Sequence, residues 1–316
     1  MYPFITDIET LQGYVPVSAE DDLLALITPD LTRALVRHVV PLVGRPFIDD
    51  LKAAIEGAPS QKQKDAIDYI NRAVAQLAMW YYSKKGGVTV DSSGLYKPKN
   101  ENRWNLSESE QARLEETYLS DGVDALEDLL AYLEEEADSF PSYANSPKRA
   151  AERSCLVPSA EIVQDIFYLL HPRLTFHAMR EGLRYAERHQ VAPLLQDYYS
   201  TLISGTPAPG SFDAEALSLA RQAVVYLGAR RALLTRGVKL TSDGFRVMME
   251  NKAQVSEHEN VRIEAAVREF EKSGEEALFH LTKLLNATPP AGYTKPDLSA
   301  ITVREKSGPK SKVLFL

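Results

Sequence analysis

Side chains able to do chemistry are present in the chain, but none recurs at the spacing of a known reactive motif. There is no phosphate-cradling glycine loop, no His-Glu-x-x-His pair and no nucleophile elbow. The single cysteine, Cys155, excludes an internal disulfide framework and a cysteine-based metal cluster, and we expect a small, partly buried side chain. We therefore predict no catalytic residue, no metal site and no cofactor. A site assembled from distant segments stays open.

The histidines do not form a ligand set in the sequence. They are scattered among predicted helices at positions 38, 171, 177, 189, 258 and 280. His171 and His177 are the nearest pair, and a gap of six residues does not place them on one helical face. Each is expected to be a surface residue or a hydrogen-bonded core residue.

The clearest basic group is a helical stripe with spacings of seven, four and four, formed by Arg173, Arg180, Arg184 and Arg188. Its simplest interpretation is a solvated helix face paired with Glu181 and Glu187. An anionic protein partner and nucleic acid stay open as alternatives. The acidic run at 134–138 is likewise interpreted as a solvated helix end.

Two short segments indicate how the chain is built. Residues 87–95 read Gly-Val-Thr-Val-Asp-Ser-Ser-Gly-Leu, and 237–245 read Gly-Val-Lys-Leu-Thr-Ser-Asp-Gly-Phe. Each is a β-prone alternation followed by a Ser/Asp/Gly cluster, which predicts a small hairpin, or finger. The fingers hold little apolar surface, so we predict contact elements and not core. The candidate contact residues are Val88, Thr89, Val90, Asp91, Val238, Lys239, Leu240 and Thr241.

The likeness continues on both sides of the fingers. Residues 37–43 match 189–195 and include a proline in each copy, Pro41 and Pro193, and residues 121–126 match 273–278. Phe47 and Leu51 are aligned with Tyr199 and Ile203 by the same comparison. Three colinear matches at nearly one offset indicate a tandem duplication.

The expected elements follow from helical periodicity and capping signals. Residues 61–85 are predicted to form the central buried helix. Its aromatic end, Met79-Trp80-Tyr81-Tyr82, is interpreted as core, with a partner-binding patch as the alternative. A capped helix is expected over 107–138, split at Gly122. Pro41 should kink or break the preceding helix because proline lacks a helical donor. Residues 140–153 are interpreted as a linker.

Length and composition agree with two ordinary globular units. The chain has 316 residues, 44% hydrophobic and 25% charged, and no apolar run of the ~18 residues that a membrane span needs. Residues 1–145 hold 25 acidic and 13 basic side chains, a net charge of −12, whereas 146–316 hold 19 and 23, a net charge of +4. Sequence divergence between the two copies would explain this difference in charge. A molecule whose two ends bind different partners is the alternative.

The last segment has a different character. Pro289, Pro290 and Pro296 forbid a long helix. Five basic residues, Lys295, Arg304, Lys306, Lys310 and Lys312, lie between Pro290 and the apolar end Val313, Leu314, Phe315 and Leu316. We expect an arm that docks on another subunit, for example by strand addition, and a disordered tail is the alternative. The predicted fold is mainly α, with two tandem helical-bundle units at 1–145 and 146–288, each with a hairpin-like finger, and an extended arm at 289–316.

The duplicated layout resembles an uncharacterised protein family found among phage and prophage structural genes. A helix with an internal proline, a long buried helix, the Gly-Val-x-Val/Leu-x-Ser-x-Gly finger and an acidic closing helix carry the resemblance, over about residues 1–288. Each unit is also similar to the small helical head-tail connector, or adaptor, proteins of tailed phages. Such connectors usually hold one unit per chain, and this chain has two.

The resemblance implies a virion structural protein of the neck region, assembled in the host cytoplasm. Its implied partners are further copies of itself in a ring, for which twelve subunits is one option, the portal protein, a tail or stopper protein, and DNA that passes through without sequence-specific binding. No membrane partner and no enzymatic activity are implied. An intracellular helical scaffold that binds other proteins is the alternative, because fold does not fix function.

Overall fold

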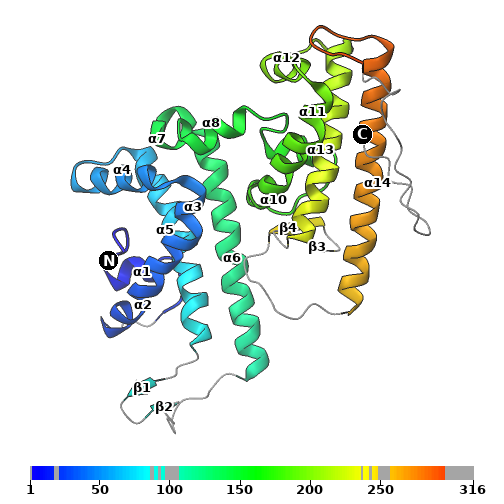
Figure 1. Cartoon of the computed structure of the whole chain (residues 1–316). Helices are drawn as coiled ribbons and strands as arrows, with labels where there is room; N and C mark the ends of the chain where they lie inside the picture. Colours follow the sequence, from blue (N-terminus) through cyan, green and yellow to red (C-terminus); the bar gives the residue numbers. More distant parts are fainter. Residues whose placement is uncertain are drawn as a thin grey trace. The chain divides into compact units, whose positions relative to one another are not determined.

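The computed structural model describes residues 2–17, 21–85, 89–91, 94–96, 107–235, 238–241, 244–247 and 257–295. This part of the chain is mainly helical (Figure 1). It divides into two compact units. Unit 1 comprises Met1–Ser154, Pro158–Ala178 and Gly237–Asn251, and unit 2 comprises Cys155–Val157, Met179–Arg236 and Lys252–Leu316. The division differs from a boundary at 145/146, because segments after residue 146 pack with unit 1 and the boundary then falls within α10.

The elements of residues 1–153 are α1 (Ile8–Gln12), α2 (Asp21–Ala34), a π turn (Leu35–Val39), α3 (Val40–Val43), α4 (Arg45–Glu56), α5 (Gln61–Lys84), β1 (Thr89–Asp91), β2 (Gly94–Tyr96), α6 (Glu108–Glu135), a 3-10 turn (Ala137–Ser139), α7 (Pro141–Ala144) and α8 (Pro147–Arg153). Those of the remainder are α9 (Ala160–Gln164), α10 (Pro172–Ala186), a π turn (Glu187–Val191), α11 (Ala192–Leu195), α12 (Tyr198–Ser204), α13 (Phe212–Leu234), β3 (Val238–Thr241), β4 (Gly244–Val247) and α14 (Glu257–Ala287).

The predicted central helix of unit 1 is confirmed as α5. Ser60 and Gln63 form a capping box at its start, which satisfies backbone donors that the first turn leaves open. Ile70, Val74 and Leu77 recur at helical spacing and are fully buried. The aromatic end is also core, since Trp80 and its neighbours are buried as expected. α2 and α6 pack against α5 and enclose this core.

α6 runs unbroken through Gly122, so the expected split at this glycine is wrong. A Cβ at Gly122 would lie 2.7 Å from Cγ of Leu77 on α5. The glycine therefore lets two helices approach and does not end one. Ser107 and Glu110 form the capping box that opens α6, as the sequence indicated.

The helix was expected to kink or break at Pro41, but the helical path continues past this proline. A π turn over Leu35–Val39 precedes the proline, Pro41 lies in the first turn of α3, and the helical path ends at Gly44 with φ 90°. The wider turn accommodates a residue that has no N–H. Unit 2 holds a second π turn before Pro193, and its helical path ends at Gln196 with φ 55°.

The predicted linker at 140–153 is folded, so that interpretation is wrong. Its residues form α7 and α8, and Phe140 and Tyr143 are buried. Their rings lie 5.5 and 6.0 Å from the Phe47 ring. The prolines that suggested a loop occupy the first positions of helices, where a missing N–H costs nothing.

In unit 2, α13 packs along α14 (Figure 1). Ser211 caps α13, and a Cβ at Gly274 of α14 would lie 2.5 Å from Cγ of Leu227. In α12 the buried side chains are Tyr198 and Leu202, one residue earlier than the alignment with Phe47 and Leu51 suggested.

Two antiparallel strand pairs complete the described elements. β1 pairs with β2, with Val90 opposite Leu95, and β3 pairs with β4, with Leu240 opposite Phe245. Thr89, Val90 and Asp91 lie in β1, and Val238, Lys239, Leu240 and Thr241 lie in β3. Val88 and the segment 296–316, including Val313, Leu314, Phe315 and Leu316, lie outside the described residues.

Candidate functional site

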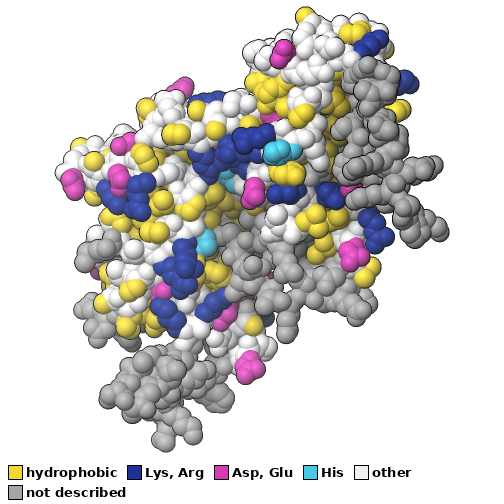
Figure 2. All heavy atoms as spheres, viewed as in Figure 1, with side chains coloured by type: hydrophobic (Ala, Val, Ile, Leu, Met, Phe, Trp, Pro, Cys, Tyr) yellow, Lys and Arg dark blue, Asp and Glu magenta, His cyan; other side chains and the backbone are white. Residues whose placement is uncertain are grey.

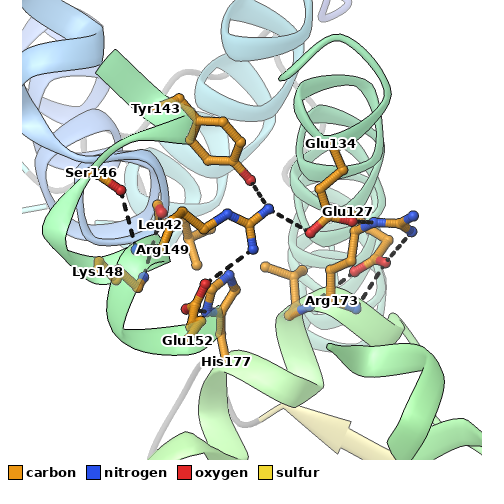
Figure 3. A network of polar contacts seen from close by, with 11 residues as sticks. Leu42, Glu127, Glu134, Tyr143, Ser146, Lys148, Arg149, Glu152, Arg173 and His177 are labelled. Atoms are coloured by element: carbon orange, nitrogen blue, oxygen red, sulfur yellow. Dashed lines mark hydrogen bonds and ion pairs between the residues drawn. The ribbon is translucent and has the colours of Figure 1, made fainter. Parts of the chain in front are cut away.

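The densest group of charged side chains in the described chain lies within unit 1. We call it the charged cluster, and it consists of Glu127, Glu134, Tyr143, Arg149, Glu152, Arg173 and His177 (Figure 3). α6 supplies the first two residues, α7 the tyrosine, α8 the next two and α10 the last two. The cluster thus joins four helices.

Arg149 is the centre of one half of the cluster. Its guanidinium donates to Glu134 at 2.7 Å, to Glu152 at 3.1 Å and to the Tyr143 hydroxyl. Burial raises the pKa of Tyr143 well above its ordinary value, so the phenol stays protonated. The start of α8 presents Arg149, because Ser146 accepts a hydrogen bond from the Arg149 N–H and Pro147 occupies the first helical position.

Arg173 is the centre of the other half. Its Nε donates to Glu134 at 2.6 Å, and its other guanidinium nitrogen lies 3.3 Å from Glu127. Glu127 also accepts the backbone N–H groups of Arg173 at 3.0 Å and Leu174 at 3.1 Å. A carboxylate at a helix N-terminus accepts hydrogen bonds from the free N–H groups of the first turn, and its negative charge is attracted to the positive end of the helix dipole. Glu127 of α6 therefore caps α10.

His177 and Glu152 complete the group. The His177 Nδ1 lies 3.6 Å from a Glu152 carboxylate oxygen, and the Glu152 side chain is only 3% exposed. These residues border a cavity of about 240 Å³, which is also lined by Arg153, Ser159, Glu161 and Phe176. The three arginines and three glutamates of the lining balance in formal charge.

The pairing decides what the cluster can do. Each guanidinium is held by carboxylates, and a buried pair that loses one partner leaves an uncompensated charge. Among the described residues, no group of three or more His, Cys, Asp or Glu side chains could hold a metal ion. We therefore interpret the cluster as a clamp that fixes α8 and the start of α10 on α6.

The predicted arginine stripe is only partly a surface feature. Arg173 belongs to the charged cluster, whereas Arg184 and Arg188 are exposed. Glu187, their expected partner, is buried and accepts from the Leu156 N–H at 3.0 Å and from the Tyr199 hydroxyl. Burial raises the pKa of Glu187. Arg180 lies on α10 and has an interaction of its own.

The other sequence candidates are placed as follows. His38 is hydrogen-bonded to Tyr81 at 2.7 Å, and His171 contacts Asp124 of α6 at 2.6 Å. Cys155 is half-buried, as expected. The cluster residues on α8 were missed because their segment was interpreted as a linker, although Ser146-Pro147 is a helix-start signal that could have found them.

On the face drawn in Figure 2, the Lys and Arg side chains of the described residues gather in several groups, with acidic and apolar side chains between them. Of the helices in the described part of the chain, none is long and apolar enough to cross a membrane.

One family model matches the chain, over residues 39–153 and 170–299, and its description is "Family of unknown function (DUF6712)". No curated protein matches the chain. No solved structure matches it either.

Proposed function

The chain belongs to the family of unknown function DUF6712, and we propose that it is a head-tail connector, or adaptor, of a tailed-phage virion. In this role, copies form a ring between the portal and the tail or stopper protein, and DNA passes through the ring without sequence-specific contacts. The ring assembles in the host cytoplasm and stays in the virion neck. No catalytic role is part of the proposal.

A tandem pair of similar units carries the proposal, because a ring is built from repeated, self-complementary blocks. Several local features support the pairing. Asn71 donates to the Phe4 carbonyl at 3.2 Å, and 150 residues later Arg221 donates to the Leu156 carbonyl at 2.9 Å. A π turn precedes both Pro41 and Pro193. The family model also covers two segments of similar length, 39–153 and 170–299.

The two hairpins are the proposed contact elements. Each follows the last turn of a long helix, α5 or α13, and is the only strand pair in its half of the described chain. The helices on either side already pack against each other, α5 on α6 and α13 on α14. A hairpin there can bind a neighbour without being needed for the core. The arm at 289–316 is proposed to add a second contact, to the portal or to a neighbouring copy.

The experiment is the mass of the purified full-length chain in solution, measured by light scattering on a sizing column and by native mass spectrometry. A closed ring of defined copy number supports the connector. A chain that stays monomeric up to high micromolar concentration, alone and with portal protein, overturns it and favours the alternative of an intracellular scaffold.

A deletion of 88–96 tests the hairpin. We expect unchanged helical circular dichroism and a loss of ring mass or portal binding. Unchanged assembly would contradict the contact role, and loss of helicity would show that the hairpin belongs to the core.

A further inference from the structure

The chain stays on unit 2 after the end of α14. Residues 288–295 turn back towards α12 (Figure 1). Among them Tyr293 is buried, with 7% of its surface exposed, and its hydroxyl donates to the Asn286 side chain at 3.0 Å. This segment belongs to unit 2, as do α11, α12 and α14. The first residues of the predicted arm are therefore packed on unit 2.

Gln196, between α11 and α12, holds this segment by its main chain. The side-chain nitrogen of Gln196 donates to the Thr294 carbonyl at 2.9 Å, and its side-chain oxygen accepts the Thr294 N–H at 2.9 Å. Two opposite residues of neighbouring antiparallel strands exchange a pair of hydrogen bonds in the same way. Because both bonds go to the main chain, they do not depend on the side chain at position 294.

Close packing surrounds these two bonds. A Cβ at Gly292 would lie 3.1 Å from the Tyr198 nitrogen and 3.2 Å from the Asp197 carbonyl carbon, and Gly292 itself has φ 83°. A glycine therefore brings the segment this near to the start of α12. Tyr198 is buried there, and its hydroxyl donates to Asp213 of α13. Residues 292–294 thus rest on a part of unit 2 that is itself held in place.

Gln196 makes its two bonds from a backbone conformation that favours glycine. Its φ is 55° and its ψ is −137°. His171 is the other non-glycine residue with positive φ in the described part of the chain. Gly44, which lies 152 positions earlier, ends the helical path of the first region with φ 90°, so a glycine is sufficient to turn the chain at such a place. A side chain with this φ adds strain that its surroundings must hold. The contact with Thr294 holds it here.

We infer that Gln196 is a latch, which binds the main chain of Thr294 and fixes the position from which residues 296–316 continue. A segment held at Thr294 has fewer conformations than one that is free from the end of α14, so it loses less entropy when it binds. The latched form should therefore bind a partner more tightly. This last step rests on the proposed contact of the arm with the portal or a neighbouring copy, whereas the latch itself does not.

Hydrogen exchange, measured by mass spectrometry on peptides that cover 288–295, tests the latch in the full-length chain. Gln196→Gly removes the amide and suits the backbone conformation, and Gln196→Glu keeps the size but places a carboxylate against the Thr294 carbonyl. We expect exchange at least tenfold faster in both variants. The matched control, Thr294→Ser, keeps the main chain that Gln196 binds and should exchange as the unchanged protein does.

Circular dichroism checks that each variant folds, and Gln196→Glu decides if Gln196→Gly does not fold. Unchanged exchange in Gln196→Glu overturns the latch. Exchange that is equally fast in the Thr294→Ser control also overturns it, because the contact would then depend on the side chain at position 294.

Association provides a second readout. Gln196→Gly should raise the concentration for half-assembly, or the Kd for portal protein, at least threefold, and Thr294→Ser should leave both unchanged. If Gln196→Gly opens the latch but associates as the unchanged protein does, the latch does not position the arm and this part of the inference is wrong. If the unchanged protein binds neither its own copies nor portal protein, the proposed function fails, and hydrogen exchange still decides whether the latch exists.

Discussion

Residues 30–130 and 180–285, which the sequence predicts to be copies of one unit, can be compared contact by contact. The His38 ring stacks on Tyr81 in the first region, and the His189 ring lies tilted against Tyr185 in the second, although these tyrosines lie on different helices of the two regions. In both, an arginine from the facing helix covers the tyrosine. What is retained is a cation on an aromatic ring between two helices, and the helix that supplies each member is free to change.

A second difference lies in the π turns. Leu35 is buried in the first turn, and the residue 152 positions later is Glu187, which is equally buried. Tyr199, which the sequence alignment pairs with Phe47, donates its hydroxyl to Glu187. A buried apolar side chain in the first turn is thus matched by a buried, hydrogen-bonded carboxyl group in the second. The polar version is tolerated because Glu187 also accepts the Leu156 N–H.

A third difference sets how closely the helices approach. Asp30 of α2 is buried and bound to Lys85, whereas Gly182 is found 152 positions later. A Cβ at Gly182 would lie 2.3 Å from the backbone oxygen of Gly228. The second region therefore brings two backbones together where the first has room for a side chain.

The largest expected effect is that of Gly182→Ala. The new methyl group would meet the backbone oxygen of Gly228, which cannot rotate away as a side chain can. α10 must therefore move away from α13, which should lower the unfolding free energy by about 3 kcal/mol. Gly122→Ala is the matched control, because the atoms within 3.0 Å of its new Cβ belong to the Leu77 side chain and the nearest backbone atom, Leu77 N, lies at 3.4 Å. Higher helix propensity offsets part of the clash. Urea unfolding measures both. Equal losses would show that the closer approach at Gly182 has no special role.

Next is the pH dependence that His38 confers on unit 1. Burial, with the charges of Arg37 and Arg33, lowers the pKa of His38 to about 4. The unfolded chain binds this proton near pH 6.5, so this stability is present above pH 6.5 and is lost as pH falls to 4. The difference between the folded and unfolded pKa of His38 corresponds to roughly 3 kcal/mol of unfolding free energy. His38→Gln introduces the glutamine that lies 152 positions later, at 190. This variant should flatten the slope of the unfolding free energy between pH 6.5 and 4. An unchanged slope would show that His38 is not the source of the pH dependence.

A smaller effect is expected at Glu187. Glu187→Leu copies Leu35 but removes the acceptor of the Leu156 N–H and the Tyr199 hydroxyl, which should cost about 1–3 kcal/mol. Adding Tyr199→Phe removes the orphaned hydroxyl and should recover part of the loss. Thermal unfolding of the single and double variants measures these losses. If the loss of stability in the double variant equals the sum of the losses in the two single variants, the Glu187–Tyr199 pairing is rejected.

The smallest effect concerns the exchanged aromatic pair. Tyr185→Arg and Arg231→Tyr should each cost about 0.5–1 kcal/mol, and the double variant, which restores the order found in the first region, should cost less than their sum. A double-mutant cycle on unfolding free energies gives the coupling. Zero coupling would mean that the stacked geometry contributes nothing.

The sequence by itself determined the long helices and their starts. Helical spacing of Ile70, Val74 and Leu77 predicted α5, and capping residues such as Ser107 predicted where a helix opens. These signals are local, because a helix satisfies its backbone within a few residues. The sequence also predicted a core position for the aromatic end of α5.

Only the tertiary structure decided the role of residues whose partners are distant. Gly122 was interpreted as a break, yet it fits the Leu77 side chain, and Pro41 was tolerated because a π turn widens the helix before it. The charged cluster was not predictable, because Glu134, Arg149 and Arg173 come from three helices and appear solvated when each is considered alone. Pairing across helices depends on packing, and no local spacing encodes it.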